Sequence, residues 1–183
     1  MKLIIQIPCF NEEETLPETV ADLPRQLDGI DVIEYLVIDD GSRDRTDEVA
    51  KSIGVHHIVS LPQNQGLANA FATGMEACIK RGADIIVNTD ADNQYQGSSI
   101  PDLVAPVLAG RADMAVGERP IGDIDDFSRT KKVLQRLGSS VVRRFSGTGV
   151  RDAASGFRAY ARDAAMRVQV FGRYTYTMET IVQ

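Results

Sequence analysis

Two aspartates separated by one residue, Asp90 and Asp92, follow a short apolar run and are the leading candidates for chemistry in this chain. Carboxylate pairs bind hard divalent cations such as Mg²⁺ or Mn²⁺, which complete their coordination with substrate phosphates. A metal at this point can stabilise the charge that develops on a departing diphosphate. So short a motif can also be a solvated acidic turn, but its place after an apolar strand, with two further polar strand ends, favours a metal site.

A second acidic group, Asp39-Asp40-Gly41-Ser42, also follows an apolar run. An aspartate at such a strand end can accept a hydrogen bond from a ribose hydroxyl or a base N–H. The same residues make a favourable Asp-Gly turn, with a helix cap supplied by Ser42 or Asp44. Both interpretations can hold together, because Asp39 can bind a ligand while Gly41 and Ser42 turn the chain.

Runs of apolar and β-branched residues predict the strands that position these groups. They lie at residues 3–7, 35–38, 56–61, 84–88 and 114–116. Helical patterns lie between them, most clearly an apolar stripe over 67–78 closed by Gly82, and more weakly after Asn11 and over 44–53. This alternation predicts an open, mostly parallel α/β sheet, with ligands bound at the carboxyl ends of its strands.

The second part of the chain is less regular. Residues 117–126 predict a mobile loop, and a helix is expected from about Ser128 to Phe145. Basic residues flank the apolar stripe of that helix, so it could lie on an anionic membrane surface or be an ordinary solvated amphipathic helix. The chain has no internal repeat and no linker, which indicates a single domain.

Composition limits the classes of function. The chain has 183 residues, of which 43% are hydrophobic and 25% are charged, as in ordinary globular proteins. A formal net charge of −6 argues against a nucleic-acid partner held by a basic field, so phosphates must be bound locally by a metal or a few arginines. Cys9 and Cys78 lack metal-ligand spacing and indicate reduced thiols. The first apolar run is far shorter than the ~20 residues of a membrane helix and no signal peptide is recognised, which predicts a cytoplasmic or cytosol-facing protein.

Four motifs follow one another in order: Pro8-Cys9-Phe10-Asn11-Glu12-Glu13, Val37-Ile38-Asp39-Asp40-Gly41-Ser42, Asp90-Ala91-Asp92-Asn93-Gln94 and Asp152-Ala153-Ala154-Ser155-Gly156-Phe157-Arg158. Together they closely resemble the family 2 glycosyltransferases, and within these the polyprenyl-phosphate branch typified by dolichyl-phosphate mannosyltransferase. The resemblance covers nearly the whole chain. It implies a GT-A fold, a Rossmann-like open sheet with a nucleotide-binding half at about 1–117 and an incomplete acceptor-binding half at about 118–183.

The resemblance also implies roles for individual residues. Those assigned to the nucleotide are Pro8, Asn11, Glu12, Asp39 and Asp90. Those assigned to the metal, Mg²⁺ or Mn²⁺, and to the diphosphate are Asp90, Asp92 and Gln94. Those assigned to catalysis are Arg119, which faces the phosphates, and Asp152 and Arg158 in the acceptor-side loop, with Asp152 as a base. Those assigned to the acceptor are Arg129, Ser155 and Glu179.

The implied reaction is an inverting, metal-dependent transfer of a hexose from a nucleotide-diphosphate sugar to a polyprenyl (dolichyl or undecaprenyl) phosphate at the membrane surface. The protein is then expected to be peripheral on the cytosolic face of the membrane. A lipid phosphate is already anionic, so cationic cover from Arg119, Arg129 and Arg158 matters more than a general base. A sugar hydroxyl as acceptor would instead require the carboxylate of Asp152.

Two alternatives remain beside this reading. One is a transferase that acts on a saccharide hydroxyl. The other is a truncated, non-catalytic remnant that binds nucleotide-sugar, because the sequence stops at Gln183 within a helical pattern, before the basic loop and membrane helices of such relatives. A dinucleotide-binding oxidoreductase is disfavoured, because no G-x-G-x-x-G follows the first strand.

Overall fold

The computed structural model describes residues 1–118, 150, 152–172 and 175–182. In chain order its elements are β1 (Lys2–Cys9), α1 (Leu16–Asp22), β2 (Val32–Asp39), α2 (Thr46–Ser52), β3 (His57–Ser60), α3 (Leu67–Lys80), β4 (Ile85–Asn88), the 3₁₀ turn η1 (Gly97–Ser99), α4 (Ile100–Leu108), β5 (Met114–Val116), β6 (Arg158–Ala161), α6 (Arg162–Arg167) and α7 (Glu179–Val182). Every strand predicted from the sequence is present. The helix expected at 128–145, and the loop expected at 117–126 except for its first two residues, lie outside the described residues.

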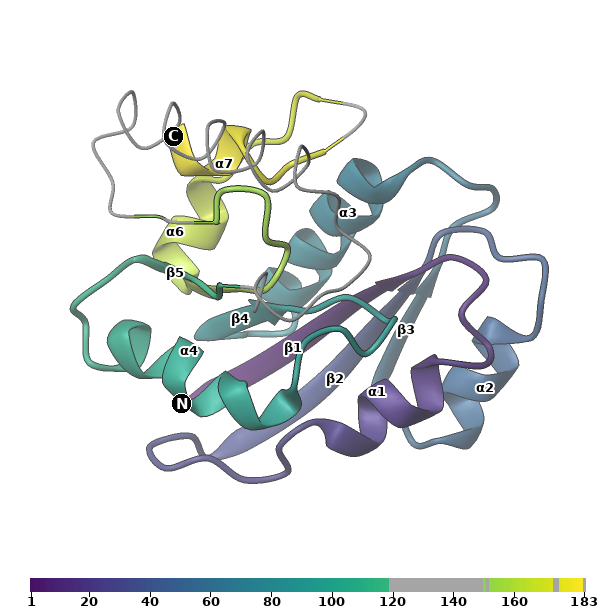
Figure 1. The fold of residues 1–183 in the computed structure, drawn as a ribbon, viewed down its shortest axis with the longest axis horizontal. Helices are drawn as coiled ribbons and strands as arrows, with labels where there is room; N and C mark the ends of the chain where they lie inside the picture. The colour runs from purple at the N-terminus through teal and green to yellow at the C-terminus, as the bar shows by residue number, and fades with distance from the viewer. Residues whose placement is uncertain (119–149, 151, 173–174, 183) are drawn as a thin grey trace, which may run out of the picture.

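The six strands form one sheet in the order β3-β2-β1-β4-β6-β5 (Figure 1). Strands β1 to β4 are parallel, whereas β6 runs antiparallel to both of its neighbours, β4 and β5. The mostly parallel α/β sheet is therefore confirmed. The chain moves outward from β1 to β3 and then crosses to β4 on the other side of β1, so the strand order reverses between β1 and β4. Open sheets of this type bind ligands at that crevice.

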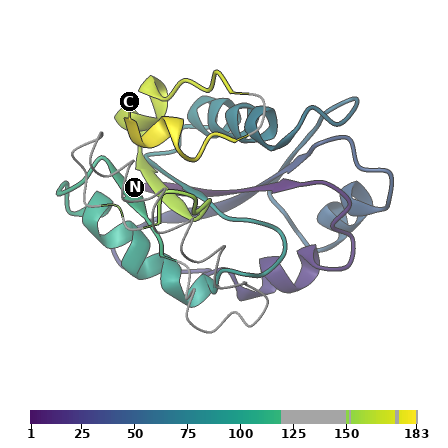
Figure 2. The same ribbon diagram turned by 45° about the horizontal axis from the view of Figure 1, so that its top comes forward.

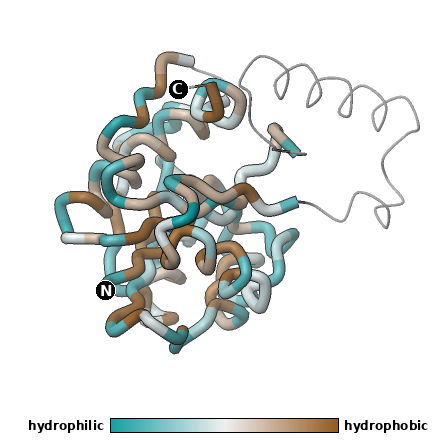
Figure 3. Tube along the Cα trace, turned by 90° about the vertical axis from the view of Figure 1, so that its left-hand side faces the viewer, coloured by the Kyte–Doolittle hydropathy of each residue, from teal (hydrophilic) through white to brown (hydrophobic). Residues whose placement is uncertain are grey.

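Helices cover both faces of the sheet (Figure 2). One core contains Leu3 and Ile5 of β1 with apolar side chains of α1 and α4. The other contains Ile4 of β1 with Phe71 of α3 and a side chain of α6. Successive side chains of a strand point to opposite faces, so the continuous apolar run in β1 fills both cores. Figure 3 shows how hydrophobic and hydrophilic residues alternate in short stretches along the chain.

Pro8 lies inside β1, although the strand predicted from the sequence ends at residue 7. The main chain of Gln6 faces β4, because its carbonyl accepts the Thr89 amide at 3.1 Å. Pro8, two residues further on, faces the same way, and the pairing of β1 with β4 ends at Gln6 and Asn88. The missing N–H of Pro8 therefore costs no ladder hydrogen bond, and β1 continues to Cys9 against β2 alone.

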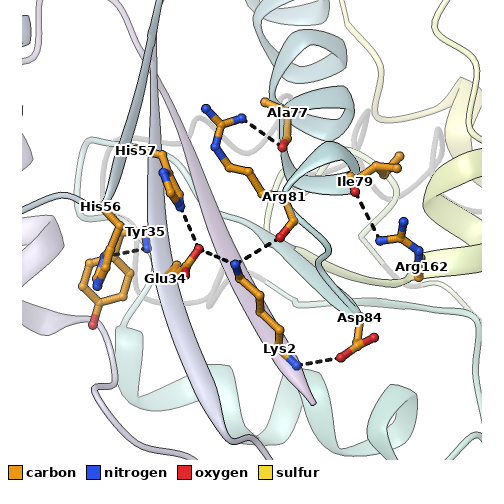
Figure 4. Close-up of polar contacts among 10 residues, drawn as sticks. All are labelled: Lys2, Glu34, Tyr35, His56, His57, Ala77, Ile79, Arg81, Asp84 and Arg162. Carbon is orange, nitrogen blue, oxygen red and sulfur yellow. Dashed lines mark hydrogen bonds and ion pairs between the residues drawn. The ribbon is translucent and has the colours of Figure 1, made fainter.

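A polar cluster joins the strands near the opposite end of the sheet (Figure 4). Glu34 of β2 binds Lys2 and His57, with 2.7 Å between its Oε2 and both the Lys2 Nζ and the His57 Nε2. The Lys2 Nζ also donates to the carbonyl of Arg81 at 3.0 Å. Partial burial raises the pKa of Glu34, but the hydrogen bonds from Lys2 and His57 outweigh it and hold this pKa below its ordinary value.

Glu34→Gln is expected to lower the free energy of unfolding by about 1 kcal/mol at pH 7. The folded-state pKa of Glu34 is depressed, so the stabilisation is present above the ordinary carboxyl pKa of 4.5 and is lost as the pH falls through the folded-state value. Urea unfolding of both proteins from pH 7 to pH 3 measures this difference. If the difference in free energy of unfolding between the two proteins grew as the pH fell, the depressed pKa of Glu34 would be contradicted.

Candidate active site

A cavity of about 350 Å³ opens at the carboxyl ends of β1 and β4, where the strand order reverses. Pro8 and Glu12 line it from the end of β1 and the loop that follows. Asp90 and Asp92 line it from the chain that follows β4. The structure thus brings four of the predicted site residues to one cavity, although they come from opposite ends of an 85-residue stretch.

The Asp-Ala-Asp segment is held in place mainly through its middle residue. Ala91 is buried, and its carbonyl accepts a hydrogen bond from the Thr19 Oγ1 of α1 at 2.9 Å. Asp92 is exposed, and its Oδ1 accepts the Gln94 amide at 3.2 Å across Asn93, which has a left-handed φ of 56°. These bonds fix the chain on which the two carboxylates lie, at the edge of the cavity.

The donor set suits a hard cation that also binds substrate. Among the residues that the structure describes, no group of three or more His, Cys, Asp or Glu could hold a metal ion by itself. Two carboxylates on a solvent-accessible cavity fit Mg²⁺ or Mn²⁺, which keep several positions for water and phosphate oxygens. Gln94, the third predicted ligand, lines a neighbouring cavity of about 640 Å³ and not the cavity of Asp90 and Asp92.

Of the residues predicted to bind the nucleoside, Asn11 joins the loops after β1 and β2, and Asp39 fixes the turn of the second loop. The Asn11 Oδ1 accepts the Arg43 amide at 2.8 Å, and the Asn11 amide donates to the Ser42 Oγ at 2.9 Å. Asn11 adopts a left-handed φ of 59° to do so. The Asp39 Oδ1 accepts the Ser42 amide at 2.9 Å, which is the turn that the sequence offered as the alternative to binding.

Asp40 also lines the cavity, a role that the sequence reasoning did not assign. Its carboxylate accepts the amides of Gln65 at 2.8 Å and Gly66 at 2.9 Å, directly before the first turn of α3. A carboxylate is favourable at a helix N-terminus, where amide hydrogens lack partners within the helix. Asp40 thereby fixes the loop that forms one wall of the cavity. The sequence did contain a signal for this role, which is the pair of adjacent acids Asp39 and Asp40. Neighbouring side chains at a strand end point in opposite directions, so the two acids were bound to have different surroundings.

The turn that contains Ser155 meets the donor side of the cavity. Tyr95, shortly after Asp92, stacks on Phe157 with ring centroids 4.9 Å apart. Its hydroxyl lies 3.3 Å from the Ser155 Oγ and accepts the Gly156 amide at 3.3 Å. A Cβ added to Gly156 would lie 3.1 Å from the Asp90 Oδ1, so the turn packs directly against this carboxylate.

Arg158 does not face the cavity, which corrects the expectation that it covers the substrate phosphates. Its side chain is fully buried at the start of β6. The Nε donates to the Ser155 carbonyl at 2.8 Å, the Nη2 to the Ala153 carbonyl at 2.9 Å and the Nη1 to the Thr180 Oγ1 at 2.7 Å. The guanidinium therefore supports the Ser155 turn from inside the protein.

The remaining predicted residues are distributed as follows. Asp152 and Ser155 are buried in the turn that Arg158 supports. Glu179 accepts the amides of Phe171 and Gly172 at 3.2 and 3.3 Å and lines neither of the two cavities named above. Arg119 and Arg129 lie outside the described residues.

The cavity carries a negative field. Burial raises the pKa of the Cys9 thiol well above its ordinary value, and the nearby carboxylates of Glu12 and Asp39 raise it further. Cys78 is also free and buried, and burial raises its pKa to about 12, so burial disfavours the reactive thiolate form of both residues. Acidic side chains around the cavity favour a cation there, which agrees with the donor set of Asp90 and Asp92.

The sequence is similar to proteins of known class. Residues 4–168 match the family described as Glycosyl transferase family 2. The chain is 30% identical to an undecaprenyl-phosphate mannosyltransferase of Micrococcus luteus, over 93% of this chain and 70% of that protein. It is 33% identical to an uncharacterized protein of Methanocaldococcus jannaschii, over 91% of this chain and 68% of that protein.

The fold is also similar to a solved structure, the glucosyl-3-phosphoglycerate synthase of Mycobacterium tuberculosis in complex with Mn²⁺, uridine-diphosphate-glucose and phosphoglyceric acid. The TM-score is 0.69 at 25% identity, and the match covers 89% of this chain and 57% of that one. The chain thus spans little more than half of the solved relative. None of the helices in the described part of the chain has the length and apolar character needed to cross a membrane.

Proposed function

Because the chain belongs to glycosyl transferase family 2, we propose that it transfers a hexose from a nucleoside-diphosphate sugar to a polyprenyl phosphate, with inversion at the anomeric carbon. One observation carries the proposal. Asp90 and Asp92 line a cavity at the strand crossover, and the Ser155 turn packs against Asp90 from the other side. Donor-side and acceptor-side groups therefore meet at one carboxylate.

The donor half of the site corresponds to residues 1–117 in this proposal. The nucleoside lies between the ends of β1 and β2, where Phe10 and Leu67 offer exposed apolar side chains on the cavity wall. We assign the Oδ2 of Asp39 to a ribose hydroxyl or base N–H, since its Oδ1 holds the turn. Pro8, Asn11 and Glu12 shape this pocket.

We assign Mg²⁺ or Mn²⁺ to Asp90 and Asp92, with phosphate oxygens completing the coordination. When bound, such a cation neutralises the charge that builds up on the departing diphosphate. The carboxylates position the cation and the diphosphate at the mouth of the cavity. The solved relative, which holds Mn²⁺ together with uridine-diphosphate-glucose, supports this assignment.

The acceptor half corresponds to residues 118–183. The mannosyltransferase of Micrococcus luteus acts on undecaprenyl phosphate, which supports a lipid phosphate as acceptor here. Such a phosphate is anionic at neutral pH and attacks without a strong base. Arg119 and Arg129 then provide cationic cover, and the protein works at the cytosolic surface of the membrane that holds the lipid.

A hydroxyl acceptor is the second candidate, because the solved relative holds phosphoglyceric acid beside its sugar donor. Asp152 would then act as the base. Asp152→Asn separates the two candidates: a lipid-phosphate acceptor predicts a rate within about tenfold of wild type, whereas a hydroxyl acceptor predicts a loss of about 10² to 10⁴. Transfer assays with polyprenyl phosphate and with small hydroxyl acceptors measure both.

Calorimetric titration tests the donor site directly. UDP, GDP, CDP and dTDP are each titrated with Mn²⁺ and again with EDTA. We expect one diphosphate to bind in the micromolar range, about −8 kcal/mol at 1 μM, and the binding to vanish in EDTA. Binding without transfer to any acceptor would identify a nucleotide-binding remnant, and no binding to any diphosphate would contradict the proposal.

A further inference from the structure

A chain of buried amides runs under the candidate site from one strand to the next. Gln6 of β1 and Asn88 of β4 are neighbours in the parallel register, and both side chains are fully buried. The Gln6 Nε2 donates to the Asn88 Oδ1 at 2.8 Å. Polar side chains at the centre of a parallel sheet are unfavourable unless their hydrogen-bonding groups are satisfied. Apolar packing therefore does not explain why two amide side chains occupy these positions, and the explanation must lie in what their hydrogen bonds hold.

The Asn88 amide nitrogen reaches two segments that are distant in sequence. Its Nδ2 donates to the Gly156 carbonyl at 2.9 Å and to the Tyr176 hydroxyl at 2.9 Å. With the bond from Gln6, the Asn88 side chain uses its oxygen and both of its amide hydrogens. One side chain, two residues before Asp90, thus holds the acceptor-side turn and the chain that precedes α7.

The Tyr176 hydroxyl and the Asp90 carboxylate both approach Gly156. A Cβ placed on Gly156 would be 3.1 Å from the Tyr176 Oη, 3.1 Å from the Asp90 Oδ1 and 3.3 Å from its Oδ2, so the two groups lie close to the same point. The tyrosine ring is fixed by a parallel stack on Phe71, with centroids 3.7 Å apart. Because the hydroxyl accepts from Asn88, its own proton remains available for an acceptor on another side.

We propose that Asn88 and Tyr176 are positioning residues, which set the Asp90 carboxylate against the Ser155 turn and so align the donor and acceptor sides of the site. Asn88 holds the turn through the Gly156 carbonyl, and Tyr176 holds Asp90 in the orientation that receives the cation. The role of Tyr176 in cation binding rests on the proposed function. The role of Asn88 in holding the Ser155 turn does not. Partners behind a metal ligand commonly change metal affinity 10- to 100-fold.

The first test measures the turn without any substrate. Asn88→Asp keeps the shape of the side chain and its bond from Gln6, but cannot donate to Gly156 or Tyr176. Amide hydrogen exchange at residues 155–157 is expected to become at least about tenfold faster than in wild type. Unchanged exchange at these amides would overturn the role of Asn88, whether or not the protein binds nucleotide.

The second test measures the cation. Tyr176→Phe removes only the hydroxyl and keeps the ring stacked on Phe71. Tyr35→Phe is the matched control, because Tyr35 is also buried and its hydroxyl also makes a hydrogen bond, 3.0 Å to the Pro24 carbonyl, in the other core. The readout is the Mn²⁺ concentration that gives half-maximal binding of the preferred nucleoside diphosphate, with the melting temperature measured alongside.

We expect Tyr176→Phe to raise this Mn²⁺ concentration about tenfold, and Tyr35→Phe to leave it within about twofold of wild type at a similar loss of melting temperature. Equal shifts in the two variants, or no shift in either, would overturn the role of Tyr176. If wild type binds no diphosphate at all, the proposed function fails and the link of Tyr176 to the cation fails with it. The exchange measurement then still decides whether Asn88 holds the turn.

Discussion

Replacing Asp92 with alanine is expected to abolish Mn²⁺-dependent binding of the nucleoside diphosphate, with a loss of affinity of at least about 100-fold, or about 2.7 kcal/mol. Asp92 is one of four carboxylates on the cavity, with Glu12, Asp40 and Asp90, and the cation proposed to bind Asp90 and Asp92 would offset the negative field around Cys9. Asp92 is exposed and makes only a 3.2 Å bond to the Gln94 amide, so the fold should be little affected. Calorimetry with and without EDTA measures the effect, and circular dichroism checks the fold.

Two further variants isolate the charge. Asp92→Asn can still accept the Gln94 amide but loses the carboxylate, so it should bind as poorly as Asp92→Ala. Asp163→Ala removes an exposed aspartate from the first turn of α6, which lines neither cavity, and should bind as wild type does. If folded Asp92→Asn binds the nucleoside diphosphate with the same Mn²⁺-dependent affinity as wild type, the assignment of Asp92 to the metal is wrong.

Gly41→Ala is expected to lower the free energy of unfolding by about 3 kcal/mol. Gly41 has a φ of 71°, which disfavours any side chain. A Cβ there would also lie 2.4 Å from the Gln63 carbonyl carbon and 2.6 Å from the Asn64 nitrogen, both in the backbone. The loop that Asp40 holds against the cavity must then move, so nucleotide binding should weaken as well. Urea unfolding and calorimetry measure the two effects.

The chain offers a control that separates backbone strain from collision. Gly54 has a φ of 78°, and a Cβ built on it meets nothing within 4 Å. Gly54→Ala should therefore cost only the left-handed conformation, about 1 kcal/mol, and leave nucleotide binding unchanged. If Gly41→Ala and Gly54→Ala lowered the free energy of unfolding equally, the collision with residues 63 and 64 would not contribute to the loss of stability.

The strands and the strand-end acids could be predicted because their signals are local. Apolar runs that end in Asp39 and Asp90 mark β2 and β4, and the strand crossover then brings their ends together with that of β1. Helix α4 was missed although Ile100, Leu103, Val104 and Val107 are buried at helical spacing. The two prolines in this short segment obscured the pattern, since proline usually ends or bends a helix.

Strand β6 and the role of Arg158 could not be predicted, because their cause is tertiary. Arg-Ala-Tyr-Ala carries a charge that a local pattern assigns to the surface, but Arg158 is buried since the turn and Thr180 together satisfy its donors. Asn88 and Tyr176 are 88 residues apart, and their bond forms where the chain folds back on β4, the strand that β6 pairs with. Nothing in either local sequence indicates this bond.

The antiparallel direction of β6 also bears on the order in which the molecule folds. Because β6 runs against β4, the residues just before it reach the same rim as the end of β4. The Asn88 amide meets Gly156 across 68 residues and Tyr176 across 88, whereas β1 meets β2 across only about 30. Closing longer loops carries a larger entropic cost, so we expect the β1–β2 pair to form early and the rim around Asp90 to be completed last. A folding intermediate would then contain the β1–β2 pair without the completed rim around Asp90, and Mn²⁺ with diphosphate would slow unfolding more than it speeds folding.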